Sequence, residues 1–167
     1  MGQYRRYFVP GGTYFFTVRL RDQSSKLLVD RIDLLRHCVR LTQARHPFDI
    51  KSAVILPAKI HMIWALPVDD MDYSGRWKQI KSTFSRHLDQ PASQTPSMRK
   101  RGEKGIWQPR FWEHLIRDQQ DYDLHDHLIA TAPLREGLVS QGTHWPYCSA
   151  YKRRPVQTVN GPHPSAA

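Results

Sequence analysis

The chain has 167 residues, of which 25 are Lys or Arg and 15 are Asp or Glu, so its formal net charge is +10. A chain of this length predicts a single domain, because it can bury about 70% of the surface that its unfolded form exposes. The two cysteines, Cys38 and Cys148, lie far apart in the sequence. Their spacing excludes a zinc knuckle or a thioredoxin-like motif and predicts two reduced, structural thiols.

The same composition limits the partners and the cell compartment. No apolar run approaches the roughly 18 residues that a transmembrane helix needs, and residues 1–7 are polar and basic, unlike a signal peptide. We therefore expect a cytoplasmic protein with no membrane contact. The excess of positive charge suits a polyanionic partner such as a nucleic acid.

The first half of the chain predicts three strands and one helix. Residues 13–20 are aromatic and β-branched, as in a strand. Apolar residues recur at helical spacing over 25–45, and His46-Pro47 supplies the stop. Residues 50–56 and 60–66 then predict two strands joined by a tight connection.

The second half begins with an amphipathic basic helix whose apolar positions run from Trp77 to Leu88. Residues 89–105 are polar, hold two prolines and offer no hydrophobic face, which predicts a mobile basic loop. A strand is expected over 107–116. A last helix is expected over about 119–131, capped by Asp118 and ended with the help of Pro133.

This order of elements predicts an α+β, ferredoxin-like split βαβ fold. We expect an antiparallel four-stranded sheet with two helices on one face, plus a C-terminal helix. The domain is predicted over 1–151. Residues 152–167 are first basic and then contain Pro and Ser, which predicts a disordered tail.

Basic residues cluster in several segments that could contact phosphates and give affinity that depends on salt. Near the N-terminus the cations alternate with aromatic rings, which could stack on unpaired bases. The alternative for each cluster is a solvated face without a partner. The predicted DNA-binding residues are Tyr4, Arg5, Arg6, Tyr7, Arg76, Lys78, Lys81, Arg86, Arg99, Lys100, Arg101, Lys152, Arg153 and Arg154.

Several sequence blocks stand in the order found in REP-associated tyrosine transposases, and the chain resembles that family over about residues 4–151. The most specific block is Ile106-Trp107-Gln108-Pro109-Arg110-Phe111-Trp112-Glu113-His114, followed by Ile116-Arg117-Asp118. The other matching blocks are Tyr4-Arg5-Arg6-Tyr7, Gly11 to Val18, Leu56-Pro57, Ile60 to Trp64, Leu66-Pro67, Gly137-Leu138-Val139 and Trp145-Pro146-Tyr147.

The resemblance implies a single-tyrosine HUH protein that recognises imperfect hairpins of single-stranded DNA and cuts beside them. In this family a tyrosine on the last helix attacks a phosphodiester, and two histidines on a central strand hold Mg²⁺ or Mn²⁺. Alternate residues of a strand point to one face, so a His-hydrophobic-His triplet presents both imidazoles to one ion.

This chain departs from both catalytic motifs. Lys59, preceded by Ala58, stands at the first family histidine and leaves His61 as the remnant of the metal motif. An ammonium group repels a divalent cation and must lose a proton before it can donate a lone pair, so we expect no cofactor. Leu128 stands at the tyrosine position and has no hydroxyl, and Ala132 replaces a family Asn. His61 itself could be a ligand or a structural residue.

We therefore predict a family member that binds single-stranded hairpin DNA and is catalytically inactive. One alternative is an active single-strand endonuclease that uses Tyr122 as its nucleophile. Tyr122 points about 120° away from Leu128 on a helix, and its ordinary role would be packing beside residues 107–113. His125 and His127 are expected on the helix surface, because residues two positions apart on a helix face different ways.

A further alternative is an RNA-binding ferredoxin-like module, since such sheets can stack bases on aromatic side chains. The sequence leaves open the DNA target, the choice between monomer and homodimer, and any host role that replaced transposition. It also leaves open whether the losses at Lys59 and Leu128 are natural or engineered.

Overall fold

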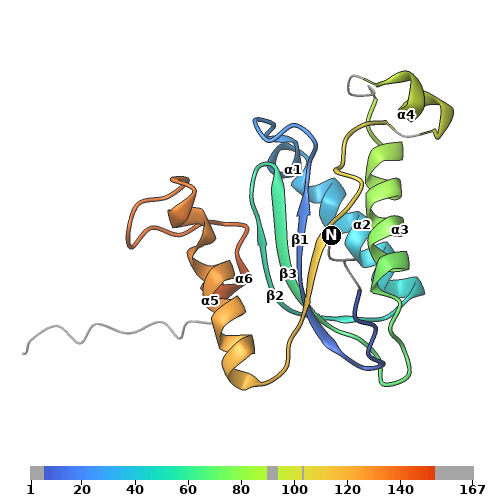
Figure 1. Cartoon of the computed structure of the whole chain (residues 1–167). Helices are drawn as coiled ribbons and strands as arrows, with labels where there is room; N and C mark the ends of the chain where they lie inside the picture. Colours follow the sequence, from blue (N-terminus) through green and yellow to red (C-terminus); the bar gives the residue numbers. More distant parts are fainter. Residues whose placement is uncertain (1–5, 90–93, 103, 153–167) are drawn as a thin grey trace, which may run out of the picture.

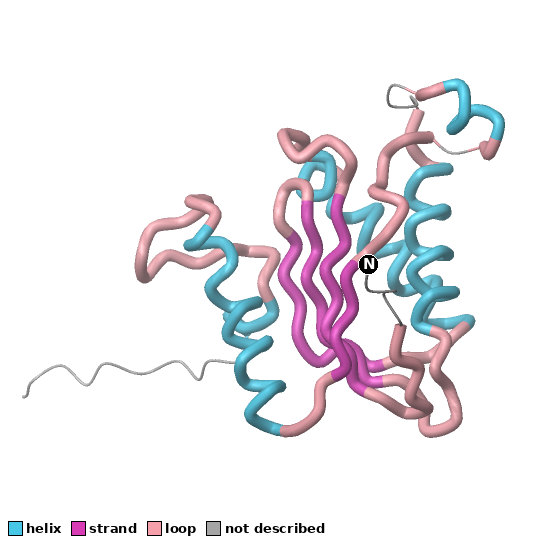
Figure 2. Tube along the Cα trace, viewed as in Figure 1, coloured by secondary structure: helices cyan, strands magenta, loops and turns pink. Residues whose placement is uncertain are grey.

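The computed structural model describes residues 6–89, 94–102 and 104–152. Its sheet has the order β2-β3-β1-β4, and every neighbouring pair is antiparallel. Helices α2 and α3 cover one face and α5 lies on the other (Figure 1). The predicted α+β split βαβ fold with an added C-terminal helix is confirmed (Figure 2). The strands are β1 (Thr13–Arg19), β2 (Asp49–Ile55), β3 (Lys59–Ala65) and β4 (Trp112–Leu115), and the main helices are α2 (Ile32–Arg45), α3 (Tyr73–Arg86) and α5 (Gln119–Arg135).

Burial of both faces of the sheet explains the nearly continuous apolar sequence of β1. Successive side chains of a strand point to opposite faces, so Tyr14 and Phe16 join the larger core under α2 and α3, while Phe15 joins a second cluster under α5. In the larger core Trp64 of β3 stacks on Trp77 of α3 with 4.4 Å between ring centroids. The cluster under α5 consists of Phe15, Val54, Leu56, Ile63, Ile129, Ala132 and Cys148.

Two elements of the first prediction differ in detail. The helix expected over 25–45 is divided into α1 (Leu27–Asp30) and α2, because Arg31 has φ −116° and ψ 37°, outside helical values. The expected loop 89–105 contains the short helix α4 (Pro96–Lys100). Thr95 accepts a hydrogen bond from the Met98 amide and the Met98 side chain is buried, so the expectation of a segment without hydrophobic contacts was wrong. The mobility of this loop stays a prediction.

Prolines account for two further differences. The strand predicted over 107–116 is regular only in β4, with Trp107 forming an isolated bridge to Leu20, because Pro109 has no N–H for a ladder. Helix α5 does not end at Pro133 but continues to Arg135. A proline in the last turn removes one donor without breaking the preceding turns, and the helix ends before Gly137, whose φ is +69°.

The C-terminal part of the chain returns to the edge of the sheet. The Ile55 amide donates to the Tyr147 carbonyl, Val54 bridges Cys148, and α6 (Ser149–Lys152) follows. Both cysteines are free and buried, as predicted. Among the described helices, none combines the length and apolar character that crossing a membrane requires.

Candidate nucleic-acid interface and the face beneath helix α5

A cavity of about 710 Å³ lies between α3 and the segment that leads from α4 to β4. Lys78, Ser82 and Arg86 line it at intervals of four residues, the spacing that places side chains on one face of a helix. We call this cavity the basic groove. Its described lining includes five cations, Lys78, Lys81, Arg86, Arg101 and Lys104, and an apolar floor of Ile106, Trp107, Pro109 and Phe111.

Hydrogen bonds fix the floor of the basic groove to α3. The Trp107 indole donates to the Lys81 carbonyl at 3.2 Å and to the Ser85 hydroxyl at 3.1 Å. Lys104 donates to the carbonyls of Ser85 and Leu88 near the end of α3, where backbone acceptors lack helical partners. Lys81 donates to the Gln108 carbonyl at 2.9 Å. Lys81 and Lys104 therefore hold the groove together.

The N-terminal segment reaches the same groove. The Arg6 guanidinium lies 4.4 Å from the centroid of the Phe111 ring and donates to the Ser74 hydroxyl at 3.0 Å. Tyr7 is exposed. The fold thus gathers basic residues from the N-terminal segment, α3 and the region after α4, which the sequence presents separately. Of the remaining predicted contacts, Arg99 and Lys100 are exposed on α4, Lys152 lies in α6 but its side chain is outside the described set, and Tyr4, Arg5, Arg153 and Arg154 lie outside the described residues.

The burial of Arg76 contradicts its predicted role as a phosphate contact. Its side chain is 2% exposed and forms a two-pronged ion pair with Asp70, with distances of 2.8 and 2.9 Å. It also donates to the carbonyls of His46 and Pro47. A buried guanidinium needs such partners to offset its desolvation. Arg76 therefore ties α3 to the end of α2, and its assignment to the DNA interface was wrong.

On the opposite face of the sheet, Lys59 and His61 of β3 both point toward α5, as the alternation of the strand predicts. Lys59 Nζ donates to Glu136 Oε1 at 2.5 Å, just beyond the last residue of α5. His61 Nδ1 is 2.8 Å from the Thr17 hydroxyl, and its ring stacks on Phe15. The Lys59 ammonium is therefore held in an ion pair beside His61.

The surroundings of His61 keep its imidazole neutral. Burial, and then the positive charges of Lys59, Arg19 and Arg135, together lower the pKa of His61 from 6.5 to about 3. A divalent cation would meet the same repulsion, and Lys59 has no lone pair to offer while it is protonated. This donor set does not fit Mg²⁺ or Mn²⁺.

Leu128 lies on α5, and its backbone carbonyl is close to one of these cations. Arg135 donates to that carbonyl at 2.7 Å and is also near enough to His61 to lower its pKa. Glu136, the partner of Lys59, follows Leu128 by about two helical turns. Arg135 therefore lies near both Leu128 and His61, and Glu136 pairs with Lys59, at the junction of α5 and β3.

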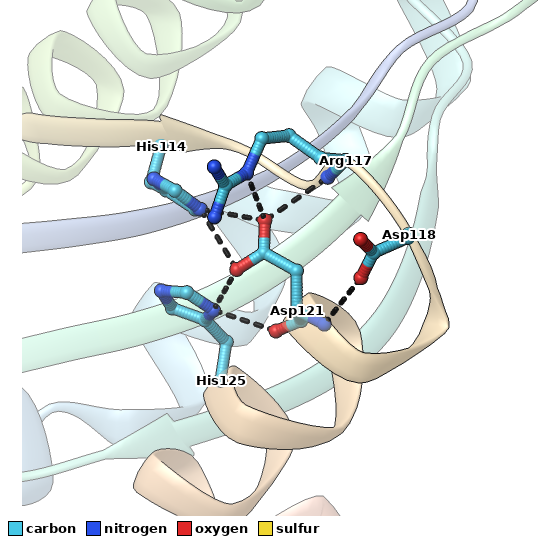
Figure 3. A network of polar contacts seen from close by, with 5 residues as sticks. All are labelled: His114, Arg117, Asp118, Asp121 and His125. Atoms are coloured by element: carbon cyan, nitrogen blue, oxygen red, sulfur yellow. Dashed lines mark hydrogen bonds and ion pairs between the residues drawn. The ribbon is translucent and has the colours of Figure 1, made fainter.

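A buried carboxylate organises the start of α5 (Figure 3). Asp121, with 5% of its side chain exposed, accepts hydrogen bonds from His114 at 2.9 Å and from the Arg117 amide at 3.0 Å. Burial would raise the pKa of Asp121, but hydrogen bonds from His114 and Arg117 outweigh it and hold the pKa at about 2. His125 lies 3.2 Å from the same carboxylate and donates to the Asp121 carbonyl at 2.7 Å. The expectation that His125 lies on the helix surface was wrong.

The cluster of His114, Asp121 and His125 has the residue types of a metal site but not the geometry. The two imidazole rings are stacked, with centroids 4.4 Å apart and planes 19° from parallel, so their lone pairs lie in separate, nearly parallel planes and do not converge on one ion. Donors already surround the carboxylate. The cluster instead clamps the first turns of α5 to β4, which fixes the direction of the helix that carries Leu128.

Tyr122 and His127 occupy ordinary positions on α5. Tyr122 is partly buried and packs against the cluster under α5, so its packing partner differs from the 107–113 segment that was expected. His127 is exposed, as expected.

The chain was compared with known proteins. No protein-family model matches it. A REP-associated tyrosine transposase of Escherichia coli is 41% identical over 152 residues, which cover 91% of this chain and 84% of that protein. The chain belongs to the REP-associated tyrosine transposase family. A Haemophilus influenzae protein named for the same family is 39% identical over 153 residues, covering 91% of this chain and 87% of that protein.

A solved structure supports the same family assignment. It is that of a REP-associated tyrosine transposase bound to a REP hairpin, and it matches with a TM-score of 0.77 and 41% identity over 91% of this chain and 84% of the other. The family resemblance inferred from the sequence blocks and the α+β fold inferred from the order of elements are thereby confirmed.

Sequence reasoning missed three features of these sites. Glu136 gave no signal as the partner of Lys59, because the two are 77 positions apart. Asp121 could have been noticed as a carboxylate in the first turn of a helix, but not as the acceptor for two histidines. The floor of the basic groove falls in the family block Ile106 to His114, which was interpreted as a strand.

Proposed function

We propose that this chain binds single-stranded hairpin DNA through the basic groove and does not cleave it. The formal charge of +10, the groove with five cations and the hairpin-bound relative support DNA binding. Unpaired nucleic acid suits a groove that combines cations with aromatic rings, because phosphates meet the charges while bases meet the rings. An RNA partner has no comparable support.

The ion pair between Lys59 and Glu136 carries the proposal of inactivity. It puts a paired ammonium where the family motif has a metal-binding imidazole, and the further charges of Arg19 and Arg135 act on His61. Leu128 provides no oxygen for a phosphotyrosine link, and no base or metal can compensate for an absent nucleophile. The chain therefore needs no metal cofactor for its proposed binding role.

The test of inactivity is a search for a covalent protein–DNA adduct. The protein is incubated with a REP-like hairpin that carries a single-stranded extension, in buffer with Mn²⁺, and separated by denaturing electrophoresis. We expect a native gel shift without any protein-linked strand. A linked strand would refute inactivity, and its loss in Tyr122→Phe would then identify Tyr122 as the nucleophile.

The test of the interface compares two double variants with the same change in charge. Lys78→Ala with Arg86→Ala removes two exposed cations from the basic groove, whereas Arg40→Ala with Arg45→Ala removes two exposed cations from α2. If both groove cations contact phosphates, the slope of log K against log salt should fall by about 1.4, at about 0.7 for each contact with a single strand. Equal slopes in both double variants would contradict binding through the groove.

A further inference from the structure

An exposed apolar surface lies at one end of the sheet, where the segment before β1 meets the loop between β3 and α3 (Figure 1). Eight large apolar side chains are exposed among the described residues, and half of them gather here. Apolar side chains that are exposed as a cluster, rather than singly, mark contact sites. We call this surface the acidic corner, because it consists of Phe8, Val9, Val68 and Met71 together with the exposed carboxylates of Asp69 and Asp72.

Close packing holds the two segments of the acidic corner together. The Gly11 amide donates to the Asp70 carbonyl at 2.9 Å. Gly11 has φ +66°, and a Cβ at this position would lie 3.1 Å from the Val68 backbone, so the close approach of the two segments requires glycine. Phe8 stacks on Tyr73 with 5.1 Å between ring centroids. The corner is therefore a formed surface before any partner arrives.

The charge of the acidic corner selects its partner. Asp69 and Asp72 repel the phosphates of a nucleic acid, and they repel the same two carboxylates of an identical corner. The basic groove has the opposite charge and, like the corner, an apolar part. Lys78 and Arg86 are exposed on its rim, and Pro109 is exposed on its floor. The two surfaces therefore match in both charge and polarity.

We propose that the acidic corner of one copy of this chain docks into the basic groove of a second copy, and that this contact and DNA binding exclude each other. The corner lies at the start of α3 and the groove runs along the same helix, so a single molecule cannot join the two surfaces. A contact between two different surfaces can repeat, so assemblies of more than two copies can form. The exclusion rests on the proposed binding of DNA in the groove, whereas the contact between copies does not.

Both parts of the contact favour association. Val68 and Met71 leave water when they meet the apolar floor of the groove. The carboxylates of Asp69 and Asp72 approach the cations of the rim, and salt screens this attraction because the groups lie at the surface. Self-association should therefore weaken as the salt concentration rises.

Sedimentation equilibrium of the full chain measures the contact through the mean mass of the particles. We expect the mass to rise with protein concentration at low salt and to fall toward that of one chain at high salt. Hairpin DNA should convert the assemblies into complexes that contain one chain each, because it fills the grooves. An unsubstituted chain that stays monomeric at every concentration would overturn the inference.

A pair of double variants tests the acidic corner. Val68→Ser with Met71→Ser removes two exposed apolar side chains from the corner, and Leu124→Ser with Leu134→Ser removes two exposed apolar side chains from α5. We expect the corner variant to weaken self-association at least about tenfold through the lost apolar burial. The α5 variant should associate as the unsubstituted chain does. Equal association of both double variants would show that the corner is not the contact.

Mixing the corner variant with a groove variant tests the pairing of the two surfaces. Lys78→Ala with Arg86→Ala removes the exposed charge of the groove and leaves the corner intact. Neither variant should associate with itself, but the groove of the corner variant should accept the corner of the groove variant. We expect a mixture with a mass of two chains and no more. A mixture that stays monomeric would overturn the inference, as would a groove variant that associates as strongly as the unsubstituted chain.

Hairpin binding separates this inference from the proposed function. The corner variant keeps its groove, so it should bind the hairpin at least as tightly as the unsubstituted chain. If the unsubstituted chain binds the hairpin without losing its higher mass, the exclusion is wrong while hairpin binding stands. If none of the proteins binds the hairpin, the proposed function and the exclusion fail together, and the mass of the mixture still decides whether the corner meets the groove.

Discussion

Mild acid should destabilise this protein through His61. The fold holds the pKa of His61 at about 3, against an ordinary value of 6.5, chiefly because the ring is buried and then because Lys59, Arg19 and Arg135 lie near it. The His61 imidazole therefore stays neutral in the folded protein at pH values where it takes up a proton in the unfolded chain, which begins below about pH 6.5. Proton uptake by the unfolded chain alone lowers the free energy of unfolding as the pH falls.

The magnitude follows from the difference in pKa. Each pH unit below the unfolded pKa and above the folded one costs about 1.4 kcal/mol, so lowering the pH from about 6.5 to 5 should remove up to about 2 kcal/mol. Within this window Asp121 and Asp70 stay ionised, because their pKa values are both about 2. Comparison with a variant at position 61 isolates the contribution of His61.

Urea unfolding at several pH values measures this effect. His61→Gln keeps a polar group near Thr17 and does not titrate, so its stability should fall less between pH 6.5 and 5 than that of the wild type. Lys59→Met should keep most of the pH dependence, because burial is the larger cause of the lowered pKa. Equal pH dependence in wild type and His61→Gln would refute the argument, as would an NMR titration of His61 with a midpoint near 6.5.

Three further predictions concern residues that the fold places in defined roles. The double variant Lys59→His with Leu128→Tyr should form a covalent adduct with the hairpin in Mn²⁺. If it does not, Ala132→Asn and a polar residue in place of Ala58 are added. Continued inactivity would then contradict the roles assigned to these positions. Asp121→Asn should lower the free energy of unfolding by about 3 kcal/mol, since it removes the charge from a buried hydrogen-bonded network. Asp118→Asn, the same chemical change at the N-cap of α5, should leave the free energy of unfolding almost unchanged, because Asn caps a helix as well as Asp does. Similar losses of stability for Asp121→Asn and Asp118→Asn on urea unfolding would contradict the role of Asp121 in holding α5 to β4. Arg76→Met should lower the free energy of unfolding by about 3 kcal/mol, because Asp70 and two backbone carbonyls lose their buried partner. The salt dependence of its DNA binding, measured below its unfolding temperature, should match that of the wild type. A reduced slope of log K against log salt would show that Arg76 belongs to the interface.

The order of strands and helices could be predicted from local patterns, because the aromatic and β-branched run in 13–20 and the helical period in 77–88 reflect which side chains are buried. The absence of a nucleophile at Leu128 is equally a property of the sequence, since no fold can give leucine a hydroxyl. The family followed from motif blocks in a fixed order. These conclusions needed only residue identity and spacing along the chain.

Tertiary structure decided which charged groups are available and which are already paired. Arg76 and Lys78 look alike on a helical wheel of basic residues, yet one is buried against Asp70 and the other lines the basic groove. Lys59 pairs with Glu136, which lies 77 positions further along the chain, and Ser52 donates a hydrogen bond to Asp126, 74 positions further. Such partners are fixed by the packing of α5 on the sheet, and the desolvation that makes an ion pair necessary arises only when distant segments exclude water together. The exclusion of water by distant segments cannot be predicted from local spacing. The basic groove, the contacts of Asp121 with His114 and His125, and the ion pair of Lys59 are therefore seen only in the folded chain.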